Sequence, residues 1–234
     1  VTSLGIPVVP GYSGDIQSNE QIKPIVKEIG YPVIVKATSG GGGKGMRIVN
    51  SENELWDSIV SAQNEAGLAF GNDKVFIEKF LSKPRHIEIQ IFGDGKGKAV
   101  HLYSRDCSLQ RKYQKILEEA PALNIPKEKL DEIQNICVRA CEEINYEGAG
   151  TLEFLYENGQ FFFIEMNTRI QVEHPVTEYL SGVDLITQQI LIASNEELKL
   201  KQADIKLNGH AIECRINAED PETFLPSPGK ISIF

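Results

Sequence analysis

Polar residues alternate with apolar ones in residues 163–175, whose sequence is FIEMNTRIQVEHP. Residues two positions apart on an extended segment point to the same side. One face would therefore carry Glu165, Asn167, Arg169, Gln171 and Glu173. A metal cation at Glu165 and Asn167, and an anionic substrate at Arg169, would supply the charged partners that this face needs. The alternative interpretation is a solvated edge strand.

A glycine-rich segment at residues 39–45, SGGGGKG, matches the G-x-G-x-x-G pattern of dinucleotide-binding loops. That pattern requires a helix directly after the glycines, whereas residues 46–49 have the composition of a strand. A P-loop would need Ser or Thr after Lys44, where this chain has Gly45. The remaining interpretations are a plain linker and a strand-loop-strand flap whose backbone N–H groups can cover phosphates. Lys36 favours the flap, because it lies on the strand before the loop and is placed to reach a phosphate.

Residues 105–121, RDCSLQRKYQKILEEAP, contain two further candidates. Gln110 offers donors and acceptors to a sugar or phosphate, and Lys115 offers a point charge to an anion. Taken alone, such a stretch is more often a solvated loop than a site.

Glu153 is a stronger candidate, because it lies on a strand expected to form a hairpin with the strand that carries Glu165. A strict two-residue turn at Asn158 and Gly159 would place the two carboxylates on opposite faces of the pair. An odd-length loop or a β-bulge would place them together, as a shared divalent ion requires.

The composition is that of a globular protein: 234 residues, 41% hydrophobic, 24% charged, with a net charge of −9. The absence of a basic patch argues against a nucleic-acid partner. The sequence contains no long apolar run and no signal-peptide pattern, which argues against a membrane or secreted protein. The four cysteines form no C-x-x-C pair, which favours reduced thiols in a cytoplasmic compartment over a zinc site.

Periodicity predicts two α+β domains, residues 1–80 and 81–234. In the first we expect helices at 18–29 and from 51 to about 66, where Ser51 and Glu54 match a capping box. Its strands are expected at 31–37, 46–50 and 75–78. In the second we expect strands at 86–92, 98–103, 151–156, 161–166 and 209–217, with helices at 126–145 and 184–193. His86, Glu88 and Gln90 would share one strand face. Antiparallel hairpins that carry helices favour this class over a doubly wound sheet.

Together these motifs resemble the biotin carboxylase component of biotin-dependent carboxylases, which has the ATP-grasp fold. The resemblance runs nearly end to end, and its most specific part is the string at residues 165–178, EMNTRIQVEHPVTE. The other matching segments are residues 33–37, 40–46, 85–90, 118–121, 215–219 and 226–230. The resemblance implies mostly antiparallel sheets with flanking helices, in two subdomains around a nucleotide cleft.

The resemblance also implies a role for each matching residue. The residues that would bind ATP are Lys36, Gly42, Gly43, Glu78, Lys79, Phe80, Leu81, His86 and Gln110, together with Glu153 and Glu165. Mg²⁺ or Mn²⁺ would be held by Glu153, Glu165 and Asn167. Bicarbonate would contact Lys115, Arg169, Gln171 and Val172, with Glu173 as its general base. Arg215 would stabilise the biotin enolate.

The activity implied is the ATP- and bicarbonate-dependent carboxylation of biotin on a carrier protein, through carboxyphosphate. The implied partners are a biotin carboxyl carrier protein or domain, a carboxyltransferase and a second copy in a homodimer, in cytoplasmic fatty acid biosynthesis or a related pathway. The alternatives are another ATP-grasp ligase that joins a carboxylate to an amine, and a nucleotide-binding fragment without turnover.

Two features depart from the family pattern. Tyr113 stands where members often carry His, so a nucleotide contact assigned there is in doubt. The family also places a domain with another ATP-contacting lysine before the position of Val1, and the remainder of a C-terminal domain after Phe234. We therefore expect an ATP-grasp core that folds, but binds nucleotide weakly and does not carboxylate biotin in isolation.

Overall fold

The computed structural model describes residues 2–39, 45–111 and 114–230. The chain divides into two compact units. Unit 1 contains Val1–Ser3, Pro7–Pro84 and Gln160–Phe163. Unit 2 contains Leu4–Ile6, Arg85–Gly159 and Ile164–Phe234. A short 3-10 helix, η1 (Thr2–Leu4), precedes the first strand.

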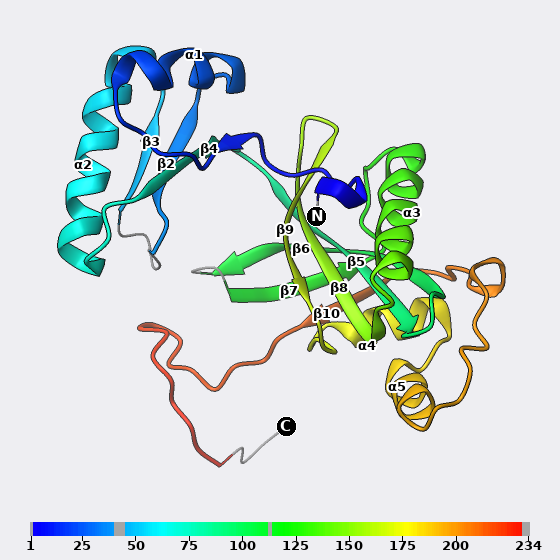
Figure 1. Cartoon of the computed structure of the whole chain (residues 1–234). Helices are drawn as coiled ribbons and strands as arrows, with labels where there is room; N and C mark the ends of the chain where they lie inside the picture. Colours follow the sequence, from blue (N-terminus) through cyan, green and yellow to red (C-terminus); the bar gives the residue numbers. More distant parts are fainter. Residues whose placement is uncertain (1, 40–44, 112–113, 231–234) are drawn as a thin grey trace. The chain divides into compact units, whose positions relative to one another are not determined.

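Unit 1 is a four-stranded antiparallel sheet with two helices (Figure 1). The strand order is β1-β4-β2-β3, and the strands are β1 (Gly11–Tyr12), β2 (Val33–Ala37), β3 (Met46–Val49) and β4 (Val75–Lys79). Strands β2 and β3 pair with Lys36 opposite Met46, which confirms the expected strand-loop-strand hairpin. Gly42 and Gly43, which lie between these two strands in the sequence, are outside the described residues.

The helices of unit 1 are α1 (Asn19–Ile29) and α2 (Glu52–Phe70). Helix α1 begins after Ser18, whose hydroxyl accepts a hydrogen bond from Gln21 N at 3.3 Å. Helix α2 begins after Ser51 as predicted, but Glu54 Oε2 accepts from Asn50 N at 3.3 Å, so the capping-box partner was wrong. It continues four residues past the predicted end, to Phe70, and Gly71, with a left-handed φ of 67°, terminates it.

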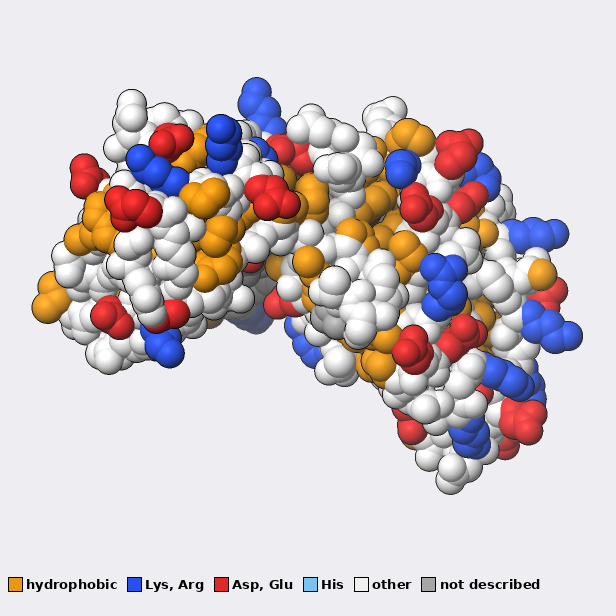
Figure 2. Space-filling model, turned by 45° about the horizontal axis from the view of Figure 1, so that its top comes forward, with side chains coloured by type: hydrophobic (Ala, Val, Ile, Leu, Met, Phe, Trp, Pro, Cys, Tyr) orange, Lys and Arg blue, Asp and Glu red, His pale blue; other side chains and the backbone are white. Residues whose placement is uncertain are grey.

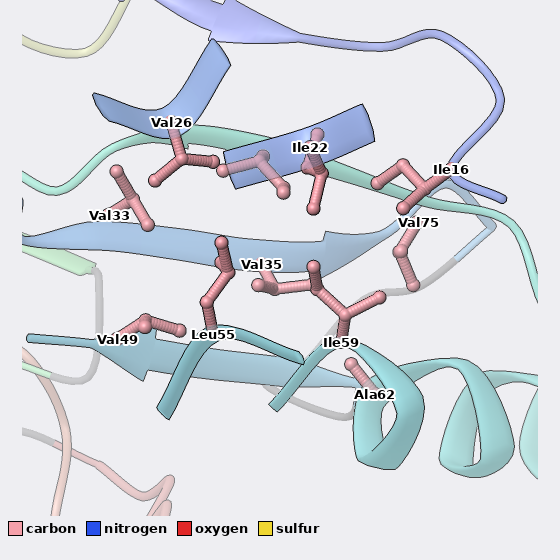
Figure 3. Packing of buried hydrophobic residues seen from close by; sticks show 11 residues of the cluster. Ile16, Ile22, Val26, Val33, Val35, Val49, Leu55, Ile59, Ala62 and Val75 are labelled. Carbon is pink, nitrogen blue, oxygen red and sulfur yellow. The ribbon is translucent and has the colours of Figure 1, made fainter. Parts of the chain in front are cut away.

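The core of unit 1 lies between the two helices and the sheet, as Figure 3 shows. It collects apolar side chains from both helices and from β2, β3 and β4. The fully buried members include Ile22 and Val26 on α1, Val35 on β2, and Leu55 and Ile59 on α2. The 3.6-residue spacing of these helical residues turns one face of each helix toward the sheet.

Unit 2 is a six-stranded sheet in the order β10-β7-β6-β5-β8-β9 (Figure 1). Its strands are β5 (Arg85–Asp94), β6 (Ala99–Arg111), β7 (Gln114–Ala120), β8 (Glu147–Glu157), β9 (Gln160–Asn167) and β10 (Ala211–Cys214). Its helices are α3 (Lys127–Glu143), α4 (His174–Ser181) and α5 (Leu185–Ala193), with a 3-10 turn, η2 (Gln202–Asp204). Helix α3 packs on β5 and β6.

Two expectations for unit 2 were wrong. A solvated loop is the commoner interpretation of residues 105–121 taken alone, but the described residues 105–111 and 114–120 are strands: β6 continues to Arg111, and β7 pairs with both β6 and β10. That interpretation failed because Arg105 and Glu118 are fully buried in ion pairs and Lys115 is largely buried in another, whereas charge in a sequence usually indicates solvent. Tyr113 lies outside the described residues.

Residues 163–175 are not one extended segment. Strand β9 ends at Asn167, and α4 begins at His174 with Pro175 in its first turn, a position that proline favours. Five polar side chains therefore do not line one strand face. Glu165 and Asn167 belong to β9, whereas Arg169 and Gln171 lie in the connection to α4 and Glu173 caps that helix.

Acidic and basic side chains are interspersed on the face that Figure 2 shows. Among the described residues, no helix combines the length and apolar character needed to span a bilayer.

The core of unit 1 can be tested with Ile59→Ala. Ile59 is fully buried, whereas the adjacent Val60 is 36% exposed. Ile59→Ala should lower the free energy of unfolding by about 2–5 kcal/mol, because it removes buried methyl groups and leaves a cavity. Val60→Ala should cost less than about 1 kcal/mol. Urea denaturation of the purified chain measures both, and equal losses would show that α2 does not pack as described.

Candidate functional site

A cluster of charged side chains crosses the sheet of unit 2. The register of the strands creates it, because Glu88 on β5 stands opposite Arg105 on β6 and opposite Glu153 on β8. Directly opposed residues project from the same face of a sheet. Glu88 and Arg105 are fully buried and Glu153 is 4% exposed, so their charges must be met by partners within the protein. His86 and Gln90 face the same network, as predicted for β5.

Lys115, on β7, lies among three carboxylates. Its Nζ is 2.6 Å from Glu88 Oε2, 3.0 Å from Glu153 Oε1 and 2.7 Å from Glu173 Oε1. Each of the three ammonium protons therefore has its own acceptor. Burial alone would lower the pKa of Lys115, but the adjacent Glu88 carboxylate and its other partners raise it above the ordinary value. Lys115 is thus a fixed positive charge.

Glu173 caps α4 and joins two cations. Its Oε1 accepts from Lys115, and its Oε2 accepts from Arg215 at 2.9 Å. Arg215, which follows β10, also donates to Glu118 Oε1 at 2.7 Å. Burial would raise the pKa of the 2%-exposed Glu173 carboxyl, but the hydrogen bond and charge of Lys115 lower it below the ordinary value. The carboxylate is therefore ionised at neutral pH.

Glu153 accepts hydrogen bonds from three side-chain nitrogens through Oε1: Lys115 Nζ, Asn167 Nδ2 at 2.9 Å and Gln171 Nε2 at 2.8 Å. Its Oε2 lies 2.8 Å from His86 Nε2. Burial would raise the pKa of Glu153, but His86 and Lys115 outweigh it and lower the pKa from 4.5 to about 2.

The neighbour Gln110 indicates which tautomer a neutral His86 ring takes. Gln110 Nε2 donates to Cys107 O at 2.9 Å, which fixes the orientation of the amide. The same nitrogen is 3.2 Å from His86 Nδ1, so Nδ1 is the acceptor of the imidazole. The ring proton then belongs on Nε2, facing Glu153.

Glu165 and Glu153 both face the amide nitrogen of Asn167. Asn167 Nδ2 is 2.9 Å from Glu153 Oε1 and 3.4 Å from Glu165 Oε1. The turn between β8 and β9 has two residues at positive φ, Asn158 at 52° and Gly159 at 78°. Strict pairing across such a turn would separate the two carboxylates, but the amide of Asn167, at the end of β9, contacts both of them. The amide nitrogen occupies a position suited to a cation.

The oxygens of Glu153, Glu165 and Asn167 form the kind of set that a divalent cation prefers. His86, Glu88 and Glu153 also bring ligand atoms within 4.8 Å of one another. Lys115, however, already contacts both of those carboxylates. In the set of Glu153, Glu165 and Asn167 the lysine contacts Glu153 but not Glu165 among the described salt bridges, so this set is the better candidate for a metal.

The residues expected to contact an anion differ in exposure. Arg169 is exposed, and its Nη2 is 3.2 Å from Asn167 Oδ1. Among the described residues it forms no salt bridge, so its charge is available to a ligand. The side chain of Val172 is 61% exposed, whereas Gln171 is 6% exposed and belongs to the buried network.

The remaining candidates lie in unit 1. Lys36 Nζ is 2.6 Å from Glu78 Oε2, and both side chains are about one-third exposed. Lys79 Nζ donates to the backbone carbonyls of Gly30 and Tyr31, at 2.9 Å each. Phe80 N donates to Pro32 O at 3.0 Å, and the adjacent Leu81 is half-buried.

Sequence reasoning missed Arg105 and Glu118, and assigned Glu88 a strand face but no partner. All three are fully buried. A usable signal was present: Glu88 interrupts an isoleucine-rich strand, and a carboxylate in such a strand requires a buried cation.

The fold is the ATP-grasp fold, as the resemblance predicted. The family described as "Carbamoyl-phosphate synthase L chain, ATP binding domain" matches residues 1–201, and the chain belongs to that family.

The relatives are more specific. Biotin carboxylase of Pseudomonas aeruginosa is 56% identical over 231 residues, which are 98% of this chain and 51% of that protein. The solved β-γ-ATP complex of Campylobacter jejuni biotin carboxylase is 50% identical, with a TM-score of 0.81, over 99% of this chain and 52% of that one. The biotin carboxylase domain of Hydrogenobacter thermophilus 2-oxoglutarate carboxylase was solved with MgADP, ADP and bicarbonate. It is 50% identical, with a TM-score of 0.78, over 96% of this chain and 50% of that one. The chain spans about half the length of the curated relatives it matches.

The lowered pKa of Glu153 predicts acid sensitivity. Because the folded state holds this carboxyl ionised, its contribution to stability is present above about pH 4.5 and is lost as the pH falls toward about 2. Glu153→Gln should therefore make the free energy of unfolding fall less steeply below pH 4.5. Urea denaturation of the chain between pH 7 and 3 measures the slope, with Glu132→Gln on the exposed face of α3 as the control. Parallel slopes for all three proteins would contradict the assignment.

Proposed function

We propose that the protein containing this chain carboxylates biotin on a carrier protein, using ATP and bicarbonate. The observation that carries the proposal is the set of contacts of Glu173. This buried carboxylate is held between Lys115 and Arg215, and it lies four residues after Arg169, whose exposed guanidinium has no salt bridge within the described part of the chain. The relatives named biotin carboxylase support it.

The anion site would bring together Arg169, Lys115, Gln171 and Val172. Bicarbonate is a poor nucleophile until it loses its proton, so a base must stand beside the cations that hold it. Glu173 suits that role, because its lowered pKa keeps it ionised and Lys115 fixes its orientation. To accept the proton, one Glu173 oxygen exchanges its present cation for bicarbonate.

ATP would take its phosphate contacts from Lys36 and the backbone of Gly42 and Gly43. Its adenine and ribose contacts would come from Glu78, Lys79, Phe80, Leu81, His86 and Gln110. Mg²⁺ or Mn²⁺ would be held by Glu153 and Glu165, with Asn167, and would neutralise charge on the phosphates. The crowding of carboxylates at this end of the network supports a cation there.

Bond formation between a bicarbonate oxygen and the γ-phosphorus of ATP would release ADP and give carboxyphosphate. Its breakdown to CO₂ and phosphate leaves the phosphate as the base for biotin N1, which then takes up CO₂. Arg215 would stabilise the enolate form of biotin, and it is needed only in this second stage. Its present bonds to Glu118 and Glu173 hold the guanidinium in place.

The partners proposed for the whole protein are a biotin carboxyl carrier protein or domain, a carboxyltransferase and a second copy of the subunit. The second candidate function is an ATP-grasp ligase that joins a carboxylate to an amine. ADP release measured with and without bicarbonate and free biotin separates the two. Dependence on bicarbonate supports biotin carboxylation, and dependence on an amine contradicts it.

Arg169→Ala in the full-length protein should reduce bicarbonate-dependent ATPase activity by about a hundredfold or more, the usual scale for losing one preorganised charge contact. Arg139→Ala, which removes an exposed arginine from α3, serves as the matched control. A coupled ADP assay at saturating ATP measures both variants. Equal activities would remove Arg169 from the anion site.

Arg215→Ala tests the division into two stages. The variant should retain more of the bicarbonate-dependent ATPase activity than of the biotin carboxylation activity, because Arg215 is assigned to the second stage only. Carboxybiotin formation and ADP release are measured on the same preparation. Parallel losses would contradict the separate roles.

A further inference from the structure

Arg105 is the most buried cation of the network. Its side chain is fully buried at the centre of the sheet of unit 2. A guanidinium has five N–H donors, and here each has its own side-chain acceptor. The acceptors are Glu88 Oε1 at 2.5 Å, Gln90 Oε1 at 2.7 Å, Thr177 Oγ1 at 2.8 Å, Gln171 Oε1 at 3.0 Å and Thr151 Oγ1 at 3.3 Å. All five donors are occupied, so Arg105 can affect a ligand only through these partners.

The contact with Gln171 determines which way its amide points. Gln171 Oε1 accepts from Arg105, and Gln171 Nε2 donates to Glu153 Oε1 at 2.8 Å. A guanidinium only donates and a carboxylate only accepts. The reverse orientation of the amide would therefore place its NH₂ group against the Arg105 donor and its oxygen against the Glu153 acceptor. Arg105 therefore holds Gln171 in one rotational state against Glu153.

The contact with Glu88 extends to Lys115. Glu88 divides its oxygens, so that Oε1 accepts from Arg105 and Oε2 accepts from Lys115 at 2.6 Å. Both are fixed in a side chain that is fully buried. Lys115 in turn donates to Glu173 at 2.7 Å.

The contact with Thr177 reaches the helix that Glu173 caps. Thr177 is on α4, one turn after Glu173. It is 2% exposed, and its hydroxyl accepts from Arg105 at 2.8 Å. Arg105 thus contacts α4 directly and Lys115 through Glu88, and these are the helix and the side chain that position Glu173.

We infer that Arg105 is a positioning residue for the anion site. Arg105 orients Gln171 directly, Lys115 through Glu88, and Glu173 through α4. The inference rests on the proposed function, because it assigns these three residues to bicarbonate. Arg105 itself does not touch the substrate.

Arg105→Lys in the full-length protein tests the inference, because it keeps the charge but cannot supply five donors in a planar fork. We expect the KM for bicarbonate in the ATPase assay to rise about tenfold or more, the scale of losing one charge-assisted hydrogen bond. A merely structural defect would lower kcat through a smaller folded fraction and leave this KM unchanged. The assay is run well below the melting temperature of each variant.

Arg85→Lys is the matched control. Arg85 donates to Asp106 through two nitrogens, at 3.0 and 2.6 Å, on the same pair of strands, but outside the contacts of Arg105. It should leave the KM for bicarbonate within about twofold of wild type, because a partly exposed pair contributes little. An equal KM for Arg105→Lys and Arg85→Lys would overturn the inference.

Two further variants keep the test decisive. In a Gln171→Leu background, Arg105→Lys should raise the KM for bicarbonate by a smaller factor than in wild type, because part of its effect passes through Gln171. Equal factors in the two backgrounds would show that Arg105 does not act through Gln171.

If Arg105→Lys does not fold, Thr177→Val tests the inference in its place, because it removes one acceptor of Arg105 and keeps the guanidinium. We expect a KM increase of about threefold or more with Thr177→Val, and an unchanged KM overturns the inference. Wild-type protein without bicarbonate-dependent ATPase activity would instead refute the proposed function.

Discussion

The burial of Glu88 in the middle of an apolar strand is the constraint on which the site depends. A carboxylate removed from water must meet cations, and here it meets Arg105 on the neighbouring strand and Lys115 on the next one. Lys115 has two protons left, and they draw Glu153 and Glu173 to the same point. The arrangement of the candidate site thus follows from one buried charge and the register of the sheet.

The network does not balance its own charge. The carboxylates of Glu88, Glu118, Glu153 and Glu173 outnumber the cations Arg105, Lys115 and Arg215. Glu118 stands opposite Glu213 across β7 and β10, and each has one buried oxygen without a hydrogen-bond partner among the described residues. Burial raises the pKa of both carboxyls. Protons on this pair, or a cation at Glu153 and Glu165, would remove the excess charge.

The elements that the sequence predicted are those whose apolar residues recur with the period of a helix or a strand, such as α1, α2, the β2–β3 hairpin and the β5–β6 hairpin. Strand β7 was missed because Lys115 and Glu118 are buried only in the presence of partners from other strands. Helix α4 was missed because residues 163–175 alternate regularly, although Pro175 is a helix-start signal. The types of the other candidate residues were enough to suggest a role for them from the sequence. The role of Arg105 could not be predicted, because it depends on acceptors up to 72 residues away in the chain.

The cations assigned to the two substrates differ in how firmly they are held. Lys36 pairs with Glu78 where both side chains are about one-third exposed, and such a pair contributes at most about 1 kcal/mol. A nucleotide phosphate, with more charge than one carboxylate, can displace Glu78 at little cost. Lys115 and Arg215, by contrast, are fixed against buried carboxylates, and moving them would leave ions unpaired. Lys36 is therefore suited to follow a mobile phosphate chain, whereas Lys115 is suited to hold a small anion in one position and Arg215 to meet the biotin enolate in one position.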